Sequence, residues 1–348
     1  MIQIGNIQVS FNQKPFIIAE MSGNHNQSLD RALEIVEAAS TAGAHALKLQ
    51  TYTADTITLD VKEGDFFINK DNSLWKGSSL HDLYKIAYTP WEWHEPIMQR
   101  AKELGIICFS SPFDETAVDY LEDLNVPAYK IASFEIIHLP LIKKVASTGK
   151  PMIISTGLAS IAEIDETIQT IREAGCDQIV LLKCTSNYPA TPEDSNVLTI
   201  PHMRELFSCE VGLSDHTMGV GAAVAAVAHG ASVIEKHFTL RRSDGGVDSA
   251  FSLEPEEMNQ LVVETERAWQ SLGKITYGVS EAERSSLAFR RSLYIAENMK
   301  KGEVLNEKNL RIIRPGLGLK PKYYSILLGR KVNQDLKKGT AMNWEYIN

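Results

Sequence analysis

Cysteine is scarce in this sequence, and its spacing argues against two classes of protein. The four cysteines are Cys108, Cys176, Cys184 and Cys209, and no two of them form a Cys-x-x-Cys pair. We therefore expect neither a disulfide framework nor a thiolate zinc site, and we interpret the thiols as reduced and buried. Cys184 could act as a nucleophile, but it lies in an apolar run with no histidine nearby in the sequence, so we favour the structural role.

The sequence also lacks an excess of positive charge and lacks long apolar runs. Asp and Glu outnumber Lys and Arg by 44 to 35, which gives a formal charge of -9. Because nucleic acids and anionic membranes attract basic surfaces, we expect neither as the main partner. There is no run of roughly 18 apolar residues and no secretory leader pattern. The expected location is the cytoplasm, and local lysines must bind any anionic substrate.

What the sequence does contain is a regular alternation of short apolar runs and amphipathic segments. Leu29 to Ala42, Trp91 to Leu104, Ile161 to Glu173 and Gly219 to Ala228 have helical periodicity and lie between runs rich in Ile, Val and Leu. This order predicts a parallel sheet, and eight βα units over about 260 residues favour a closed (β/α)8 TIM barrel of the α/β class. No Gly-x-Gly-x-x-Gly follows the first run, which disfavours a dinucleotide-binding domain. The predicted strands are Phe16 to Glu20, Ala46 to Gln50, Ile106 to Ser110, Ala128 to Ala132, Pro151 to Ser155, Ile179 to Lys183, Glu210 to Ser214 and Val233 to Phe238.

The pattern changes after residue 272, which predicts two domains. Residues 1–272 form the predicted barrel, whose last helix is Pro255 to Leu272, and residues 273–286 are polar and contain glycine, as expected of a linker. Residues 287–348 carry short strand-like runs and Lys-Gly turns, which predicts a small β-rich domain of about 60 residues. The long connection from Thr51 to Thr89 is either a lid or substrate wall, or a cap that only shields the barrel.

Polar side chains close every predicted strand, at the end where barrels of this type bind substrates. Helix capping explains some of the hydroxyls, but it does not explain lysines at the ends of apolar strands. Lys48 and Lys130 predict a phosphate or carboxylate pocket, unless they form salt bridges with Glu20 or Glu135. Lys183 could instead form a Schiff base with a carbonyl substrate. The strand-end residues are Glu20, Lys48, Gln50, Ser110, Ser111, Lys130, Ser133, Ser155, Thr156, Lys183, Thr185, Ser186, Ser214, Asp215, His216, Glu235 and His237.

Two histidines at the ends of neighbouring strands predict a metal site. His216 follows the seventh run and His237 lies at the end of the eighth, and neighbouring strands are ~4.8 Å apart, so both imidazoles can reach one ion. Asp215 and Glu235 beside them strengthen this interpretation. Lys236 points to the other side of its strand and is interpreted as structural. Two protein ligands leave positions open for Lewis-acid chemistry, and the donors suit manganese, cobalt, iron or zinc.

Across nearly the whole predicted barrel, the sequence resembles the sialic acid synthases, which condense phosphoenolpyruvate with an N-acylated aldose. The C-terminal domain resembles the antifreeze-like (SAF) module of these enzymes in Lys300-Lys301-Gly302-Glu303 and Arg314-Pro315-Gly316. The matching barrel motifs are Ile17-Ile18-Ala19-Glu20 with Asn24-His25, Lys48-Leu49-Gln50-Thr51, Ser111-Pro112-Phe113, Tyr129-Lys130-Ile131-Ala132-Ser133, Ser155-Thr156-Gly157, Cys184-Thr185 with Tyr188-Pro189, Gly212-Leu213-Ser214-Asp215-His216-Thr217 and Glu235-Lys236-His237-Phe238.

The resemblance implies roles for these residues. His216 and His237 would hold the metal, usually manganese, with cobalt or magnesium as alternatives, and Glu20 or Glu135 would move protons. The enol carbon of phosphoenolpyruvate would attack the open-chain aldehyde, water would add, and phosphate would leave by C–O cleavage. Lys48, Ser111, Lys130, Ser133, Ser155 and Ser214 would bind phosphoenolpyruvate, and Glu20, Gln50, Glu135, Ser186, Tyr188 and Asp248 would lie on the sugar side.

The resemblance also implies a domain-swapped homodimer, in which Arg314, with Phe289 near it, reaches the substrate of the other subunit. Within the family, Ser186 favours the branch that makes pseudaminic acid, because neuraminic acid synthases commonly have asparagine there. The expected sugar is then 2,4-diacetamido-2,4,6-trideoxy-L-altrose. The alternatives are a neuraminic or legionaminic acid synthase, a Schiff-base pyruvate aldolase and a non-catalytic sugar-binding protein. Further segments typical of this branch are Leu49-Gln50-Thr51-Tyr52-Thr53 with Asp55, Tyr88-Thr89-Pro90-Trp91-Glu92-Trp93, Arg291-Ser292-Leu293-Tyr294 and Met21-Ser22-Gly23.

Overall fold

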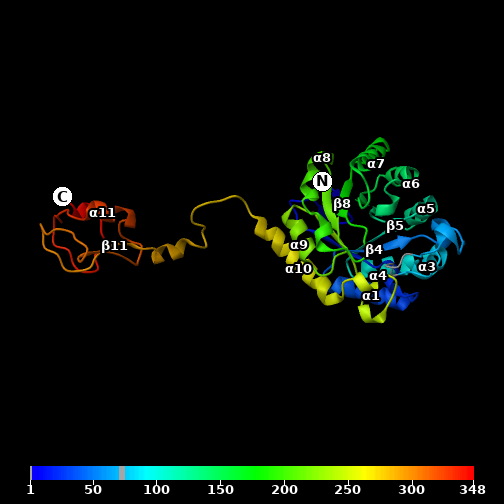
Figure 1. The fold of residues 1–348 in the computed structure, drawn as a ribbon, viewed down its shortest axis with the longest axis horizontal. Coiled ribbons are helices and arrows are strands. Elements are labelled where there is room, and N and C mark those ends of the chain that lie inside the picture. The colour runs from blue at the N-terminus through cyan, green and yellow to red at the C-terminus, as the bar shows by residue number, and fades with distance from the viewer. Residues whose placement is uncertain (1, 70–74) are drawn as a thin grey trace. The chain divides into compact units, whose positions relative to one another are not determined.

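Eight parallel strands close into a barrel in the first of the two units of the computed structural model, Met1–Gly273 and Lys274–Asn348 (Figure 1). The structure describes residues 2–69 and 75–348. Each barrel strand pairs with the next one along the chain, and β10 closes on β3, which confirms the predicted α/β barrel. The barrel strands are β3 (Phe16–Glu20), β4 (Ala46–Thr51), β5 (Ile107–Pro112), β6 (Tyr129–Ile131), β7 (Met152–Ser155), β8 (Ile179–Cys184), β9 (Glu210–Ser214) and β10 (Val233–His237).

Helices surround the strands (Figure 1), and local sequence signals explain where several of them begin. Ser28 caps α1, and Ser160 and Glu163 form a capping box at α7; such caps contribute about 1 kcal/mol each. Pro255 occupies the first turn of α10, where its missing N–H costs no hydrogen bond. Among the described residues, no helix is long and apolar enough to span a membrane. The helices are α1 (Leu29–Thr41), α4 (His94–Glu103), α5 (Glu115–Asp123), α6 (Leu139–Ala146), α7 (Ile161–Glu173), α8 (Thr199–Phe207), α9 (Gly221–Ala228) and α10 (Pro255–Leu272).

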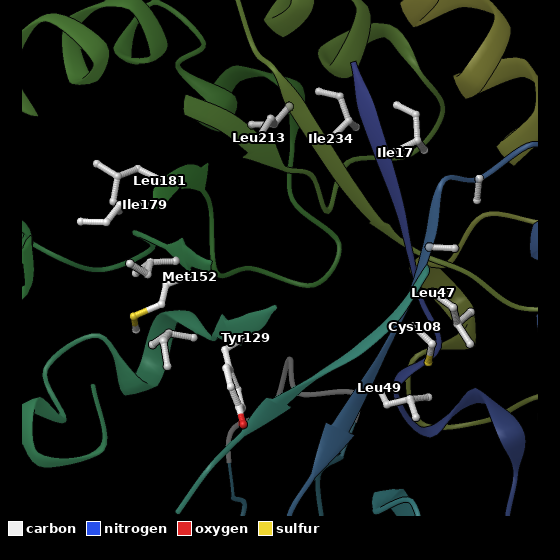
Figure 2. Packing of buried hydrophobic residues seen from close by; sticks show 14 of the residues in the cluster. Ile17, Leu47, Leu49, Cys108, Tyr129, Met152, Ile179, Leu181, Leu213 and Ile234 are labelled. Carbon is white, nitrogen blue, oxygen red and sulfur yellow. The ribbon is translucent and has the colours of Figure 1, made fainter. Parts of the chain in front are cut away.

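The alternation of side chains along each strand separates the barrel interior from the layer beneath the helices. Ile17, Leu47 and Leu181 belong to the large outer apolar cluster, part of which Figure 2 shows around the barrel. Phe16 and Leu182, one position away on the same strands, belong to a smaller inner cluster. Because successive side chains point to opposite faces, every second residue of a strand faces the interior, and this alternation decides which strand-end residues can enter the site.

The connection between β4 and α4 has helices of its own: α2 (Ala54–Ile57), η2 (Gly64–Phe66) and α3 (Leu80–Ala87). Part of this segment, residues 70–74, is outside the described residues. Trp75 Nε1 donates a hydrogen bond to the carbonyl oxygen of Val247 at 3.0 Å, which ties the segment to the loop after β10. This contact suits a substrate wall and a shielding cap equally, so its function stays a prediction.

The unit Lys274–Asn348 has its own small core and an antiparallel pair of strands, which agrees with the predicted β-rich fold. Its strands β11 (Ser292–Ile295) and β12 (Leu310–Ile313) are antiparallel. Gly302 and Gly339 end the two Lys-Gly turns with φ of 90° and 87°, a backbone conformation that glycine adopts without strain. The buried apolar residues are Leu293, Ile295, Met299, Leu305, Leu310, Leu327, Val332, Leu336 and Met342.

Candidate active site

The interior positions at the carboxyl ends of the barrel strands are polar, whereas those below them are apolar. In strand register, Glu20 on β3 lies beside Lys48 on β4 and beside His237 on β10. Gln50 lies beside Ser111 on β5. Neighbouring strands are ~4.8 Å apart. These five side chains therefore meet at one end of the barrel, as the strand-end pattern predicts.

Two lysines are buried in this polar ring, with 4% of Lys48 and 2% of Lys130 exposed. Lys48 Nζ lies 2.8 Å from Glu20 Oε2 and donates to Ser111 Oγ at 3.3 Å. Lys130 Nζ donates to Ser155 Oγ at 2.8 Å. Burial lowers the pKa of Lys130, whereas nearby carboxylates outweigh burial and raise the pKa of Lys48. The salt bridge considered for Lys48 is thus present, and the two ammonium groups with their hydroxyls also form a surface suited to an anion.

Burial raises the pKa of two glutamates at the carboxyl end of the barrel. Glu20 Oε1 accepts a hydrogen bond from Gln50 Nε2 at 2.8 Å. Burial raises the pKa of Glu20 to about 7, although Lys48 acts in the opposite direction. Glu135 follows β6 in η4 (Ser133–Glu135), and burial raises its pKa to about 7 as well. Its Oε2 is buried and has no hydrogen-bond partner among the described residues. Both carboxyls can therefore exchange protons near neutral pH.

His216 and His237 approach each other at the mouth, with ring centroids 5.4 Å apart. His216 Nδ1 donates to the carbonyl oxygen of Thr185 at 2.9 Å, which leaves Nε2 as the acceptor nitrogen. His237 Nδ1 is buried and has no hydrogen-bond partner in the described part of the chain. Burial and the neighbouring positive groups lower the pKa of His237 well below its ordinary value. A neutral imidazole with a free nitrogen is the form that binds metals, and His237 has this form. His216 differs, because the hydrogen bond and charge of Cys184 outweigh burial and raise its pKa, so a divalent cation would replace the proton on His216 Nε2.

Other acidic groups near the histidines do not complete a protein-only metal cage. Within residues 2–69 and 75–348, no group of three or more His, Cys, Asp or Glu side chains is arranged to hold a metal. Asp215, expected beside the metal, instead accepts a hydrogen bond from Lys236 Nζ at 2.8 Å on the outer face of the strands. Asp215 therefore does not add to the evidence for a metal site, and the structural interpretation of Lys236 is confirmed. Water or substrate would supply the remaining ligands, as in catalytic sites.

Aromatic rings and a carboxylate line the mouth next to the histidines. The ring centroid of Tyr188 lies 4.4 Å from the ring centroid of His216 and 5.2 Å from that of Phe251. Asp248 accepts a hydrogen bond from Ser22 Oγ, and burial raises the pKa of Asp248. Tyr188 and Asp248 are predicted site residues through the family resemblance. Ser22 and Phe251 are not, because the short 3-10 helices that carry them, η1 (Ser22–His25) and η7 (Ser249–Phe251), have no periodic signal.

Small side chains form the corner between β6, β7 and β8. Ser133 Oγ accepts a hydrogen bond from Gly157 N at 3.2 Å. A Cβ atom on Gly157 would lie 2.3 Å from Ser186 Oγ and 2.7 Å from Ser133 Oγ, so both hydroxyls converge on this glycine. Burial acts to raise the pKa of Cys184, but His216, Ser133 and Lys130 together outweigh it, and the pKa falls to about 7. The expectation that Cys184 is inert does not take His216 into account, because His216 follows the next strand, β9, and is distant from Cys184 in the sequence.

Lys183 lies outside this site. It shares the outer face of β8 with Ile179 and Leu181, which belong to the outer apolar cluster. Its Nζ donates to the carbonyl oxygen of Cys184 at 3.0 Å and to Thr185 Oγ1 at 3.2 Å. The expectation that Lys183 could form a Schiff base in the barrel pocket is therefore wrong, because side-chain alternation directs its amine away from the interior.

Glu235 enters the interior from β10, although the predicted substrate-binding residues do not include it. It is 5% exposed and accepts a hydrogen bond from Ser214 Oγ at 3.1 Å. The signal was present in the sequence, since Glu235 shares a strand face with His237. Two other predicted site residues, Phe289 and Arg314, belong to the unit Lys274–Asn348, where both are exposed. Their role at a barrel mouth stays a prediction.

Comparisons with known proteins match nearly the whole chain. The NeuB family matches residues 35–277, and the SAF domain matches residues 290–345. A pseudaminic acid synthase from Campylobacter jejuni is 44% identical over 341 residues, which cover 98% of each chain. A pseudaminic acid synthase from Helicobacter pylori is 42% identical, over 96% of this chain and 98% of its own. The crystal structure of N-acetylneuraminic acid synthetase from Leptospira borgpetersenii, in complex with citrate, superposes with a TM-score of 0.73 at 31% identity and covers 82% of this chain and 94% of that one.

Proposed function

The chain belongs to the NeuB family, and we propose that it is a pseudaminic acid synthase. The proposed reaction joins phosphoenolpyruvate to 2,4-diacetamido-2,4,6-trideoxy-L-altrose, consumes water and releases phosphate by C–O cleavage. The similarity to pseudaminic acid synthases over almost the whole chain supports this choice of sugar. The observation that carries the chemistry is the pair of buried lysines beside two histidines at the barrel mouth.

The lysine pocket binds the phosphate and carboxylate groups of phosphoenolpyruvate in this proposal. Lys48 and Lys130 supply two ammonium groups from neighbouring parts of the barrel wall, where burial excludes water and strengthens charge-assisted hydrogen bonds. Serine hydroxyls around the lysines fix the orientation of the substrate. The hydroxyls assigned to this subsite are those of Ser111, Ser133, Ser155 and Ser214.

The histidine pair holds a divalent cation, and manganese is proposed ahead of cobalt or magnesium. A bound cation would supply Lewis acidity toward the aldehyde of the open-chain sugar. The hydrogen bond from His216 Nδ1 to the carbonyl oxygen of Thr185 fixes the tautomer that presents Nε2. His237 contributes an imidazole that stays neutral because burial opposes its protonation.

Glu20 and Glu135 move the protons. The enol carbon of phosphoenolpyruvate attacks the aldehyde carbon, whose oxygen then takes up a proton. Water loses a proton as it adds to the carbon that carries the phosphate ester, and phosphate leaves with the former bridging oxygen. Carboxyls with pKa values of about 7 suit both transfers. The sugar side is assigned to Gln50, Ser186, Tyr188 and Asp248 in addition to the two glutamates.

A domain-swapped homodimer completes the proposal. The C-terminal unit of one protomer supplies Arg314, with Phe289 near it, to the sugar in the barrel of the other protomer. The guanidinium provides several donors in a fixed plane, which suits the acyl and hydroxyl oxygens of such a sugar. The cytoplasm is the proposed location.

Phosphate release from phosphoenolpyruvate, measured with a panel of acetamido sugars, tests the proposal. The 2,4-diacetamido-2,4,6-trideoxy-L-altrose should give the highest kcat/KM, above N-acetylmannosamine and 2,4-diacetamido-2,4,6-trideoxymannose. Preference for either competitor would change the assignment to a neuraminic or legionaminic acid synthase. With 18O at the bridging ester position, the label should appear in phosphate; its retention in the sugar acid would overturn C–O cleavage. Covalent trapping with pyruvate and borohydride should fail, because Lys183 faces away from the pocket.

A further inference from the structure

Glu235 lies between the two buried lysines without forming a close pair with either of them. Its Oε2 is 3.8 Å from Lys48 Nζ, and its Oε1 is 3.6 Å from Lys130 Nζ. Both separations exceed an ordinary hydrogen bond. The carboxylate is held by Ser214 Oγ at 3.1 Å, whereas Oε2 is buried and has no hydrogen-bond partner among the described residues.

Each lysine has a closer partner than Glu235. Lys48 pairs with Glu20 at 2.8 Å, and Lys130 donates to Ser155 at 2.8 Å. A buried carboxylate oxygen without a hydrogen bond is costly, and a purely structural ion pair would avoid that cost by closing to bonding distance. The negative charge of Glu235 therefore acts on both ammonium groups, but Glu235 does not hydrogen-bond to either of them. Other residues provide those hydrogen bonds.

We propose that Glu235 is a resident anion, which balances the charge of Lys48 and Lys130 when no substrate is bound and competes with any incoming anion. This inference rests on the proposed function for the identity of that anion, phosphoenolpyruvate. An anion that contacts both ammonium groups must lie close to the Glu235 carboxylate, so their repulsion weakens its binding. A substrate with both a phosphate and a carboxylate gains enough contacts to overcome this repulsion, whereas free phosphate gains fewer. Glu235 is thus a positioning residue that favours substrate over product phosphate.

The neutral substitution Glu235→Gln tests this role. Calorimetric titration of inorganic phosphate into the full-length protein, without sugar, should give a Kd at least tenfold lower than in the wild type. The KM for phosphoenolpyruvate should fall as well, and phosphate should become a stronger product inhibitor. A merely structural role predicts weaker binding, so an unchanged or higher Kd for phosphate overturns the proposal. Glu235→Asp keeps the negative charge but moves it away from the lysines. The Kd of this variant for phosphate should lie between those of the wild type and of Glu235→Gln.

A control variant, and the use of inorganic phosphate as the probe, separate the test of the Glu235 proposal from the test of the proposed function. Glu122 also pairs with a lysine, Lys150, at 2.6 Å, but it lies on α5 outside the strand-end ring, so Glu122→Gln should leave the Kd for phosphate unchanged. Thermal unfolding of each variant confirms that it is folded before titration. If Glu235→Gln tightens phosphate binding while the wild type turns over phosphoenolpyruvate with no acetamido sugar, the proposed function fails and the resident anion stands.

Discussion

The two units of the chain carry opposite net charge, and they differ in whether charged side chains are buried. Residues 274–348 contain 15 basic and 7 acidic side chains, a net charge of +8, whereas residues 1–273 contain 20 basic and 37 acidic side chains, a net charge of -17. In the barrel unit, Lys48, Lys130 and Glu20 are buried together, but no charged side chain of residues 274–348, all of which the structure describes, is buried. Burying charge is costly, so buried charge identifies a site, whereas surface charge on its own does not.

The largest effect should follow from removing a buried site residue of the barrel. His237→Ala should lower kcat by roughly three orders of magnitude or more, because the histidine pair would lose half of its metal ligands. Steady-state phosphate release and the metal content of the purified protein measure this loss. His229→Ala is the matched control, since His229 is exposed at the end of α9. Full activity of His237→Ala in the presence of a chelator would remove the metal assignment.

The next effect concerns stability and tests the cost of burying a carboxyl in the barrel. The pKa of Glu135 rises from 4.5 to about 7 on folding, so the folded state binds more protons than the unfolded state between these values. The free energy of unfolding should therefore fall as the pH rises from about 4.5 to about 7. Glu135→Gln mimics the protonated form and should be more stable than the wild type at pH 8, by up to about 3 kcal/mol.

Denaturant unfolding at pH 4.5 and pH 8 checks this difference, which should vanish at the lower pH. Glu173→Gln on the exposed face of α7 serves as the control and should show no such pH dependence. Equal stability of Glu135→Gln and the wild type at pH 8 would mean that the carboxyl is better solvated than its burial indicates.

An effect of intermediate size is expected from a charged surface residue of the unit Lys274–Asn348, and it shows whether that residue contributes to catalysis. Arg314→Ala should raise the KM for the sugar roughly tenfold, the usual cost of one charge-assisted hydrogen bond, and leave the KM for phosphoenolpyruvate nearly unchanged. Arg311→Ala removes the same charge from an exposed position on the same unit and should change neither constant. If the two variants behave alike, Arg314 is an ordinary surface residue and the barrel site is self-contained.

The barrel and most of its site could be predicted because periodicity determines them. Apolar runs predict all eight barrel strands, and their polar ends predict that Glu20, Lys48 and Lys130 meet. Alternation along β8 also indicates that Lys183 faces outward, which is at odds with the Schiff-base hypothesis. Contacts made by loops were not predictable, since nothing in the sequence joins Ser22 to Asp248. The role of Arg314 depends on resemblance alone, because an exposed arginine in a turn carries no physical signal of a ligand.

The smallest effect concerns attraction between the oppositely charged units of two protomers. If this attraction contributes to the proposed dimer, its Kd should rise severalfold when NaCl increases from about 50 mM to about 500 mM, because salt screens exposed charges beyond a few ångströms. Sedimentation velocity over a dilution series measures the Kd. Apolar contacts are the alternative, since Ile275 and Tyr277 are 94% and 96% exposed. A double substitution of these two residues by Ser should then weaken the dimer equally at both salt concentrations, and a Kd that salt leaves unchanged or lowers would show that charge does not drive assembly.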